Sequence, residues 1–333
     1  MKRLKFILPL FVVAFAFLFS CNNEDDGVIV IPPRERGPES IAAQEEIEEY
    51  LQTHFYNYEE FETPPADFNF RIVFDTIVGE NSNKTPLINQ VTSKMVTDIR
   101  DENVTYKLYY LNVRQGEGDR AEFTDISTLS YKGVNLDDST LIDSSISPIQ
   151  FDLTQIIDGL QAALVEFNAS TGFTENIDGT LTFENYGIGA VFIPSGLGYF
   201  NTPPTGSPIE FYAQLIFTFQ LYEIKKSDQD NDGILSYLED LDGDGFEGND
   251  DTDGNGIPNF ADADDDGDGR LTKNEIETNE YTFAVGEGEP TLADGEIEMQ
   301  RKTDAETGIT TIYTVIFTDA NEDGIADYLD NSL

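Results

Sequence analysis

The chain has 333 residues, of which 39% are hydrophobic, so it is long enough for two domains with cores of ordinary size. Its 64 acidic residues outnumber its 19 basic ones and give a formal net charge of -45. Such a surface repels the phosphates of nucleic acids and attracts cations, so we expect no nucleic-acid partner. A single Cys excludes an internal disulfide and cysteine-rich zinc sites, and any Ser-His-Asp triad would depend on His54, the only histidine.

Residues 1–20 have the pattern of a bacterial export signal. A basic start precedes an apolar run over residues 6–19, which is too short to span a bilayer comfortably. The run leads into Leu18-Phe19-Ser20-Cys21, which resembles the lipobox of bacterial lipoproteins. The resemblance implies cleavage before Cys21, a lipid on its thiol, and a protein anchored to the membrane of the bacterial cell envelope, at either face of the outer membrane. A plain signal peptide that happens to contain a cysteine is the alternative.

Two segments of different composition follow the signal. Residues 21–39 are polar and have no periodic apolar face, so they are expected to be a tether. Within them, Glu24-Asp25-Asp26 resembles the surface-export tag of some Bacteroidetes lipoproteins. Residues 40–99 are expected to be a partly structured flank of the next domain. In this flank the apolar spacing predicts a helix over residues 40–58, which Ser40 is placed to cap.

Several apolar runs predict strands. Residues 70–74 are the first candidate, and the polar stretch 76–103 after it is expected to be a loop. Apolar residues then recur at helical spacing from Ile156 to Phe167, where Gly159 allows close packing on a sheet. Strands before and after one amphipathic helix predict an α+β domain over residues 100–226, an antiparallel sheet wrapped around one short helix. The strands expected in it are 104–113, 126–132, 189–194 and 215–224.

Five short motifs lie in this domain in a fixed order. They are Tyr131-Lys132-Gly133, Leu141-Ile142-Asp143-Ser144-Ser145, Phe151-Asp152-Leu153 leading to Ile156-Ile157-Asp158-Gly159-Leu160, Ile193-Pro194 with Tyr199, and the apolar run from Leu215 to Leu221. In this order and at these spacings they resemble the FKBP-type peptidyl-prolyl cis-trans isomerases. The resemblance implies an FKBP-like fold and an enzyme that isomerises Xaa-Pro bonds. Its expected partners are proline-containing or unfolded exported polypeptides.

The resemblance also implies the residues of the site. Tyr131 matches a tyrosine in the wall of the pocket, and Asp143 matches the carboxylate of an Asp-Ser-Ser turn at the buried edge of the pocket. Tyr199 matches the tyrosine whose hydroxyl group forms a hydrogen bond with the ligand. Ile156 and Ile157 match a Val-Ile pair, in which the backbone N–H of the second residue anchors a carbonyl group of the substrate.

Other positions match the family less closely. Phe217 matches the aromatic residue of the last strand, but Leu160 stands at the pocket floor where Trp is usual. Ile142 replaces the Phe that usually precedes the aspartate, and Phe200 replaces the Gly that usually follows the tyrosine. Isomerisation needs no acid or base, because an apolar pocket that excludes water lowers the rotation barrier of about 18–20 kcal/mol. A pocket in which aliphatic residues replace the usual aromatic ones can bind peptides and still catalyse the rotation slowly. A binding or chaperone module with little turnover is therefore the alternative.

The composition changes at Asp228, where closely spaced acidic residues begin. A calcium loop places oxygen ligands at positions 1, 3, 5, 9 and 12, with Gly at position 6 for the sharp turn. Two segments match this pattern in full, two overlapping loops lie between them, and a fifth loop ends the chain. The residues expected to bind calcium are Asp228, Asp230, Asp232, Ser236, Glu239, Asp240, Asp242, Asp244, Asp251, Asp253, Asn255, Asn259, Asp262, Asp264, Asp266, Asp268, Thr272, Glu275, Asp319, Asn321, Asp323, Asp327 and Asp330.

The arrangement of these loops indicates a structural role for calcium. Loops that share end residues resemble thrombospondin type 3 repeats more than EF-hand pairs, because no helix precedes the first loop. Residues 227–333 are therefore expected to form a calcium-binding repeat region that contains a hairpin, and to lack the helices with which a calcium sensor opens a groove. A third hypothesis makes this region the functional part, as an adhesion or spacer element.

Overall fold

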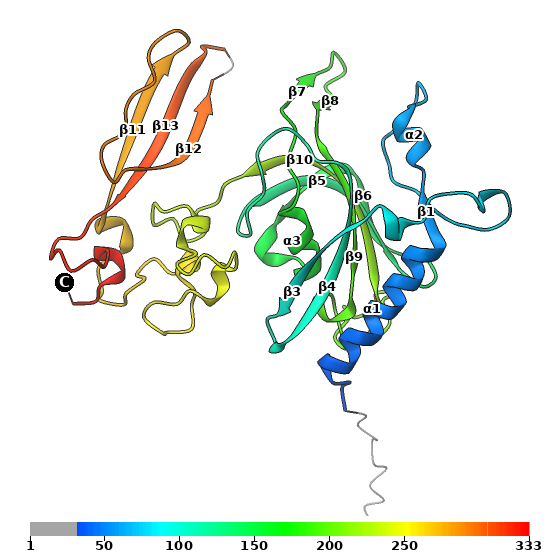
Figure 1. Cartoon of the computed structure of the whole chain (residues 1–333). Helices are drawn as coiled ribbons and strands as arrows, with labels where there is room; N and C mark the ends of the chain where they lie inside the picture. The colour runs from blue at the N-terminus through cyan, green and yellow to red at the C-terminus, as the bar shows by residue number, and fades with distance from the viewer. Residues whose placement is uncertain (1–31, 305, 333) are drawn as a thin grey trace, which may run out of the picture. The chain divides into compact units, whose positions relative to one another are not determined.

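The computed structural model describes residues 32–304 and 306–332 (Figure 1). The expected signal, the lipobox with Cys21 and most of the tether lie outside the described residues. Within the part that is described, no helix has both the length and the apolar composition needed to cross a bilayer. Residues from Glu35 onward form one compact unit.

A six-stranded antiparallel sheet forms the centre of this unit, with the strand order β3-β4-β9-β10-β5-β6. All four strands expected between residues 104 and 224 are present in it. β9 is buried along its whole length and β10 along most of it, which explains why both read as continuous apolar runs. The strands are β3 (Thr92–Asp98), β4 (Asp101–Arg114), β5 (Ile126–Asn135), β6 (Leu141–Asp152), β9 (Gly187–Ile193) and β10 (Leu215–Lys225).

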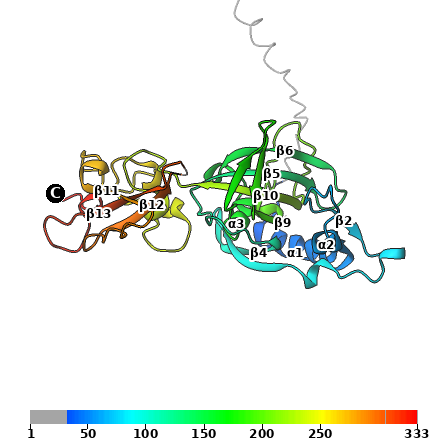
Figure 2. The same ribbon diagram turned by 90° about the horizontal axis from the view of Figure 1, so that it is seen from above.

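One short helix, α3 (Asp158–Leu164), packs on one face of the sheet. Figures 1 and 2 both show it beside β9 and β10. Its buried side chains Leu160 and Leu164 join a core that strands β4, β5, β9 and β10 also line. A Cβ atom on Gly159 would lie 2.5 Å from Cγ2 of Ile193, so the helix can approach the sheet this closely only with glycine at that position. The prediction that Gly159 allows close packing is confirmed.

A longer helix, α1 (Arg36–Thr53), covers the opposite face. Its residues Ile47 and Leu51 are fully buried in a second core with residues of β4, β9 and β10. The helix begins four residues earlier than expected, and the Ser40 hydroxyl donates to the Gly37 carbonyl instead of capping the N-terminus. The end of the expected tether is therefore helical. Because α1 covers the sheet, residues 40–99 are part of its packing and not an appended flank.

Three expectations about strands and loops are wrong. Residues 76–103 contain β3, which is an edge strand of the large sheet, so a domain boundary near residue 100 would separate two paired strands. The edge position explains the polar composition of β3, since an edge strand is only partly covered. The strand expected over 70–74 is shifted to β2 (Phe74–Thr76), which pairs with β1 (His54–Tyr56). The Asp-Ser-Ser motif lies within β6 and not in a turn.

Two smaller elements extend from the large sheet. A short helix, α2 (Tyr58–Glu62), follows β1. The insertion over 170–186 forms a hairpin of β7 (Gly172–Glu175) and β8 (Leu181–Glu184), with Gly179 in its turn at φ 81°.

The C-terminal region contains short 3-10 turns and a three-stranded antiparallel sheet in the order β11-β13-β12. β12 (Ile297–Thr303) and β13 (Ile309–Phe317) pair where a hairpin was expected. β11 (Ile276–Ala284) pairs with the other edge of β13 and was not predicted. The sheet interrupts the series of acidic loops, so that four loops precede β11 and the fifth follows β13.

Candidate functional site

Six of the seven predicted isomerase residues lie together in or against the core between α3 and the large sheet. We call them, together with Phe151, the apolar cluster. Three of the predicted residues are buried and form its inner part: Tyr131 (6% exposed), Leu160 (3%) and Phe217 (6%). Three are half-buried and pack against the same core: Ile156, Ile157 and Tyr199.

Asp143, the seventh predicted residue, is exposed at the edge of this cluster. It lies on β6, two residues from the partner of Tyr131 in the β5–β6 pairing. The Tyr131 hydroxyl donates to Oδ2 of Asp143 at 2.5 Å, and the backbone N–H of Ser144 donates to Oδ1 at 2.8 Å. The carboxylate is therefore fixed by two hydrogen bonds, although it is less buried than the resemblance implies.

The two tyrosines of the site keep their protons at neutral pH. Burial and the Asp143 carboxylate together raise the pKa of Tyr131 and also that of Tyr199. A protonated hydroxyl can donate a hydrogen bond to a carbonyl group. Tyr199 is half-buried and packs against the same core as Tyr131.

The spacing of the aromatic rings explains the Tyr-x-Gly motif. The rings of Tyr131 and Phe217 are stacked, with centroids 6.3 Å apart and an interplanar angle of 19°. Gly133 pairs with Phe217 across the β5–β10 ladder, and a Cβ atom on it would lie 2.6 Å from Cε1 of that ring. Glycine is therefore required at this position so that the Phe217 ring can lie flat over β5.

Two residues that the motifs contain, but that were not among the predicted site residues, also belong to the site. The ring of Phe151 lies 5.1 Å from that of Tyr131 at an angle of 59°, and Ile142 packs against the same core. Both are on β6, where polar residues hide the apolar positions in the sequence. The Phe-x-Leu motif contained Phe151 and was the signal that could have identified it.

The loop that carries Tyr199 is supported by α1. Arg36, in the first turn of α1, donates to Oδ2 of Asp98 at 2.5 Å and to the carbonyl of Gly196 at 3.3 Å. Its guanidinium lies 4.3 Å from the centroid of the Phe200 ring. Phe200 has φ of 49°, a conformation in which non-glycine residues are strained, and it is 6% exposed. The packing of its ring under Arg36 explains how Phe can replace the usual Gly.

The five C-terminal loops share one backbone geometry. In each loop the sixth residue is a glycine with φ between 79° and 99°, which other residues rarely adopt. Its N–H donates to the carboxylate of the first residue at 2.8–3.2 Å. The N–H of the seventh residue donates to the side-chain oxygen of the fifth at 2.6–2.9 Å. The loops begin at Asp228, Asp240, Asp251, Asp264 and Asp319, and we number them first to fifth.

The ninth residues of the loops, which were expected to be ligands, form hydrogen bonds within their own loops. In four loops the side chain at position 9 accepts a hydrogen bond from the backbone N–H at position 2, at 2.7–3.3 Å. These side chains connect positions 2 and 9 of each loop. They are Ser236, Asn259, Thr272 and Asp327.

The second loop is closed by a residue that was not predicted. Asp250 accepts the N–H of Leu241 at 3.2 Å and groups with Asp240 and Asp242. Asp251, which was expected to close the second loop and also to begin the third, accepts the N–H groups of Gly254 and Gly256 of the third loop. The second loop closes at Asp250 because four residues lie between Gly245 and Asp250, whereas two lie between the glycine and the corresponding acceptor in each of the other loops.

Carboxylate oxygens converge in three of the loops. In four groups, one oxygen from each of three residues lies within 4.8 Å of the others. The groups are Asp228-Asp230-Asp232, Asp240-Asp242-Asp250, Asp264-Asp266-Asp268, and Asp230-Glu239-Asp265. The third and fifth loops each contain an asparagine that donates to the last carboxylate of its loop. In the third loop Nδ2 of Asn255 donates to Asp262 at 2.7 Å. In the fifth loop Nδ2 of Asn321 donates to Asp330 at 2.8 Å.

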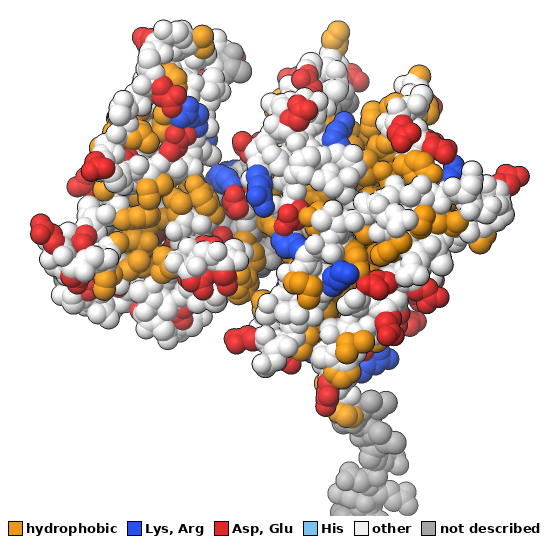
Figure 3. Space-filling model, in the orientation of Figure 1, with side chains coloured by type: hydrophobic (Ala, Val, Ile, Leu, Met, Phe, Trp, Pro, Cys, Tyr) orange, Lys and Arg blue, Asp and Glu red, His pale blue; other side chains and the backbone are white. Residues whose placement is uncertain are grey.

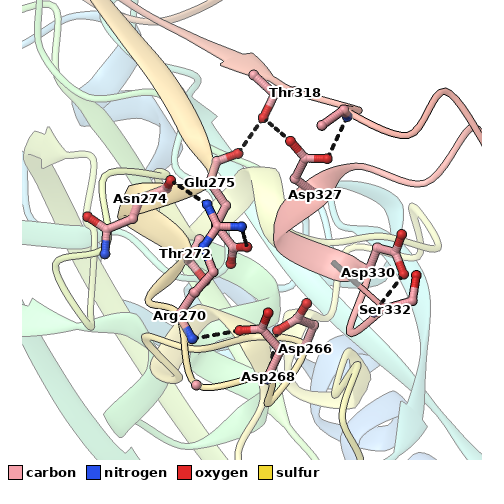
Figure 4. A network of polar contacts seen from close by, with 12 residues as sticks. Asp266, Asp268, Arg270, Thr272, Asn274, Glu275, Thr318, Asp327, Asp330 and Ser332 are labelled. Carbon is pink, nitrogen blue, oxygen red and sulfur yellow. Dashed lines mark hydrogen bonds and ion pairs between the residues drawn. The ribbon is translucent and has the colours of Figure 1, made fainter.

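The fourth and fifth loops are joined by a polar network (Figure 4). Oγ1 of Thr318 lies 2.7 Å from the carbonyl oxygen of Glu275 and 2.7 Å from Oδ2 of Asp327. The guanidinium of Arg270 forms an ion pair with Glu275 at 3.0 Å, and its backbone N–H donates to Asp268 at 2.6 Å. The end of the fourth loop and the start of the fifth are thereby connected across the ends of β11 and β13.

The burial of these carboxylates indicates a missing positive charge. Figure 3 shows more acidic than basic side chains on the face drawn, in agreement with the net charge. Burial and neighbouring carboxylates raise the pKa of Glu239 to about 11 and that of Asp265 to about 8. Burial raises the pKa of Glu275 to about 7, although Arg270 opposes this. Carboxylate oxygens without hydrogen-bond partners in Asp-rich loops fit Ca²⁺, which takes six to eight oxygen ligands.

Comparisons with known proteins agree only partly with these observations. Residues 229–289, which hold most of the first four loops, match a family described as BamM C-terminal. No curated protein matches the chain. The family match covers less than half of the chain.

Several solved structures resemble part of the chain at low identity. A peptidyl-prolyl cis-trans isomerase from Pseudomonas syringae is 18% identical, with a TM-score of 0.30, over 41% of this chain and 82% of that one. FkpA from Escherichia coli is 18% identical, with a TM-score of 0.31, over 56% of this chain and 63% of that one. The N-terminal domain of FKBP42 from Arabidopsis thaliana is 14% identical, with a TM-score of 0.30, over 41% and 95%. These scores are too low to assign a function to the chain.

Proposed function

We propose that the large sheet and α3 form a prolyl isomerase domain that acts on Xaa-Pro bonds of exported polypeptides. The observation that carries the proposal is the apolar cluster with the Tyr131–Asp143 hydrogen bond at its edge. The half-buried Phe151, Ile156 and Ile157 are the apolar side chains that a prolyl ring can contact, and the buried part of the cluster lies behind them. Tyr199 and Asp143 place polar groups beside the apolar side chains, and the packing of the cluster does not require these polar groups.

The chain's own residues account for the chemistry of isomerisation. Rotation about the prolyl bond passes through a twisted amide that has lost its resonance, so no proton needs to be transferred. The apolar cluster excludes water from the amide, and the protonated Tyr199 hydroxyl is a donor for a substrate carbonyl. Ile157, the N-cap residue of α3, is the position whose N–H is implied to anchor a second carbonyl.

A peptide-binding module with little turnover is a second candidate. Leu160 is 3% exposed at the position of the usual Trp, and Ile142 replaces a Phe beside it. Both replacements reduce the aromatic surface against which a prolyl ring can pack. Binding can survive this change while the amide is held less firmly in its twisted geometry.

The test is an isomerisation assay on the chain from residue 32 onward with a short Xaa-Pro peptide. We expect catalysis above the uncatalysed rate, and a reduction of about 10-fold or more in two variants. Tyr199→Phe removes the proposed donor to the substrate carbonyl, and Asp143→Ala removes the carboxylate that accepts the Tyr131 hydroxyl at the edge of the site. Tyr110→Phe is the matched control, since Tyr110 packs on the same core against Phe167. If the peptide binds but isomerises no faster than without the protein, the binding module is favoured. If the two variants lose no more activity than the Tyr110→Phe control, both residues are structural.

We further propose that the five loops bind calcium, and that the ions order the C-terminal region without switching the isomerase. The buried, unpaired carboxylates of the first and fourth loops support this proposal. In the metal-free chain these charges repel one another, since two charges about 4 Å apart cost about 1 kcal/mol in water and several times more near a protein surface. Calcium should protect residues 228–275 from proteolysis and leave the isomerase rate unchanged. A large change in rate would contradict the purely structural role.

The location of the protein is proposed from the sequence alone. The lipobox that ends at Cys21 supports a lipid anchor in the bacterial cell envelope. The acidic cluster that follows is compatible with an anchor at either face of the outer membrane. An anchored isomerase would meet exported polypeptides as they fold.

A further inference from the structure

We infer that a divalent cation joins the first and the fourth loop, held by Asp230, Glu239 and Asp265. One oxygen of each residue lies within 4.8 Å of the others. Asp230 and Glu239 are the third and the last residue of the first loop, whereas Asp265 belongs to the fourth. The repeat pattern of the loops does not include Asp265 among its ligand positions. The inference rests on the proposal that the loops bind calcium.

Glu239 and Asp265 are buried, Asp230 is half-buried, and all three carboxylates are incompletely paired. Glu239 is fully buried and Asp265 is 1% exposed. Within the described residues, neither oxygen of Glu239 has a hydrogen-bond partner, and the same holds for Oδ1 of Asp265 and Oδ2 of Asp230. Buried charges in proteins are paired with an opposite charge or coordinate a metal. The charges around Glu239 are themselves carboxylates, so a cation is the partner that the site lacks.

Asp265 differs from the residues at the same position of the other loops. The second position holds Gln229, Leu241, Thr252 and Ala320 in the first, second, third and fifth loops. A neutral residue at this position is therefore sufficient for the geometry of the loop, which needs only its backbone N–H. A buried carboxylate there adds a charge that the loop itself does not use.

The orientation of Asp265 is fixed by the loop to which it belongs. Oγ1 of Thr272 donates to Oδ2 of Asp265 at 3.0 Å and accepts the Asp265 N–H at 3.3 Å. These contacts occupy one carboxylate oxygen and leave Oδ1 as the unpaired one. Thr272 therefore acts as a positioning residue for Asp265.

A cation in this position would close the chain between residues 239 and 265 into a ring. The second and third loops lie within that ring, and closing a loop of this kind restricts the freedom of the chain between its ends. Loss of the bridging ion should therefore loosen residues 240–263, and not only the two loops that hold it.

The test uses the chain from residue 32 onward, with calcium alone as the ligand. Asp265→Asn keeps the acceptor for Thr272 and removes the charge, so we expect the affinity of one calcium site to fall about 10-fold or more by isothermal titration, because ligand charge sets calcium affinity. Residues 240–263 should then be cleaved by protease at calcium concentrations that protect the parent. Asp294→Asn, an exposed carboxylate between β11 and β12, is the matched control and should change neither measurement.

A double-mutant cycle separates this site from the loops in general. The effects of Glu239→Gln and Asp265→Asn on calcium affinity should be non-additive, because both remove a ligand of the same ion. Asp265→Asn and Asp244→Asn, which affects an exposed residue of the second loop, should be additive. Parent-like calcium binding in Asp265→Asn, or a loss of stability that is equal with calcium and with chelator, would overturn the inference. Absence of calcium binding by the parent would instead contradict the proposed function of the loops.

Discussion

Raising the pH of the calcium-free protein from about 5 to about 8 should unfold residues 228–275 and leave the large sheet folded. The buried carboxyl groups of this region bind their protons more tightly in the folded state than in the unfolded state. Burial and neighbouring carboxylates raise the pKa of Asp230 to about 7 and that of Asp265 to about 8. Between the ordinary and the raised pKa the folded state holds more protons, so the free energy of unfolding falls as the pH rises.

The size of the effect is comparable to the stability of a small domain. One pKa unit corresponds to about 1.4 kcal/mol. For Asp265 alone, a pKa raised from 3.8 to about 8 corresponds to a loss of about 4 kcal/mol between pH 5 and pH 8. Total stabilities of about 5–15 kcal/mol are usual, so one or two such groups can unfold the region. Calcium binds the deprotonated carboxylates and should restore the folded state at the higher pH.

Limited proteolysis and circular dichroism measure this effect, each with chelator and with calcium at both pH values. We expect cleavage within 228–275 only in chelator at the higher pH. Unfolding of the large sheet under the same conditions would show that the two regions are not independent. Equal resistance of the chelated protein at both pH values, or greater resistance at the higher one, would refute the reasoning from buried carboxylates.

Two further predictions concern the sheet and the proposed anchor. Gly133→Ala places a Cβ atom 2.6 Å from the Phe217 ring, so we expect a loss of about 1–3 kcal/mol in thermal unfolding and a lower isomerase rate. Gly288→Ala is the control, because nothing lies within 4 Å of its Cβ position; equal melting temperatures would contradict the packing argument. Cys21→Ser should release the protein from the membrane fraction or leave its signal uncleaved, because the anchor depends on one thiol. A variant that fractionates like the parent would show that the lipobox interpretation is wrong.

The sequence by itself determined the features that depend on neighbouring residues. The buried strands β9 and β10 were predicted because both faces of each are covered, which produces an uninterrupted apolar run. The acidic loops were predicted because a glycine with positive φ and alternating carboxylates form a local pattern, and all five glycines have that conformation. Six residues of the apolar cluster were located from motifs whose order the fold preserves.

Only the tertiary structure decided which segments face one another. β3 is too polar to be recognised as a strand, and it forms one because β4 supplies hydrogen-bond partners along its edge. α1 joins the domain because its apolar side chains cover a face of the sheet that no local pattern identifies. The proximity of Glu239 and Asp265 likewise depends on how the loops pack, since their separation along the chain fixes no distance between them. Burial is a property of the packed chain, and it is burial that turns these ordinary acidic residues into a candidate cation site.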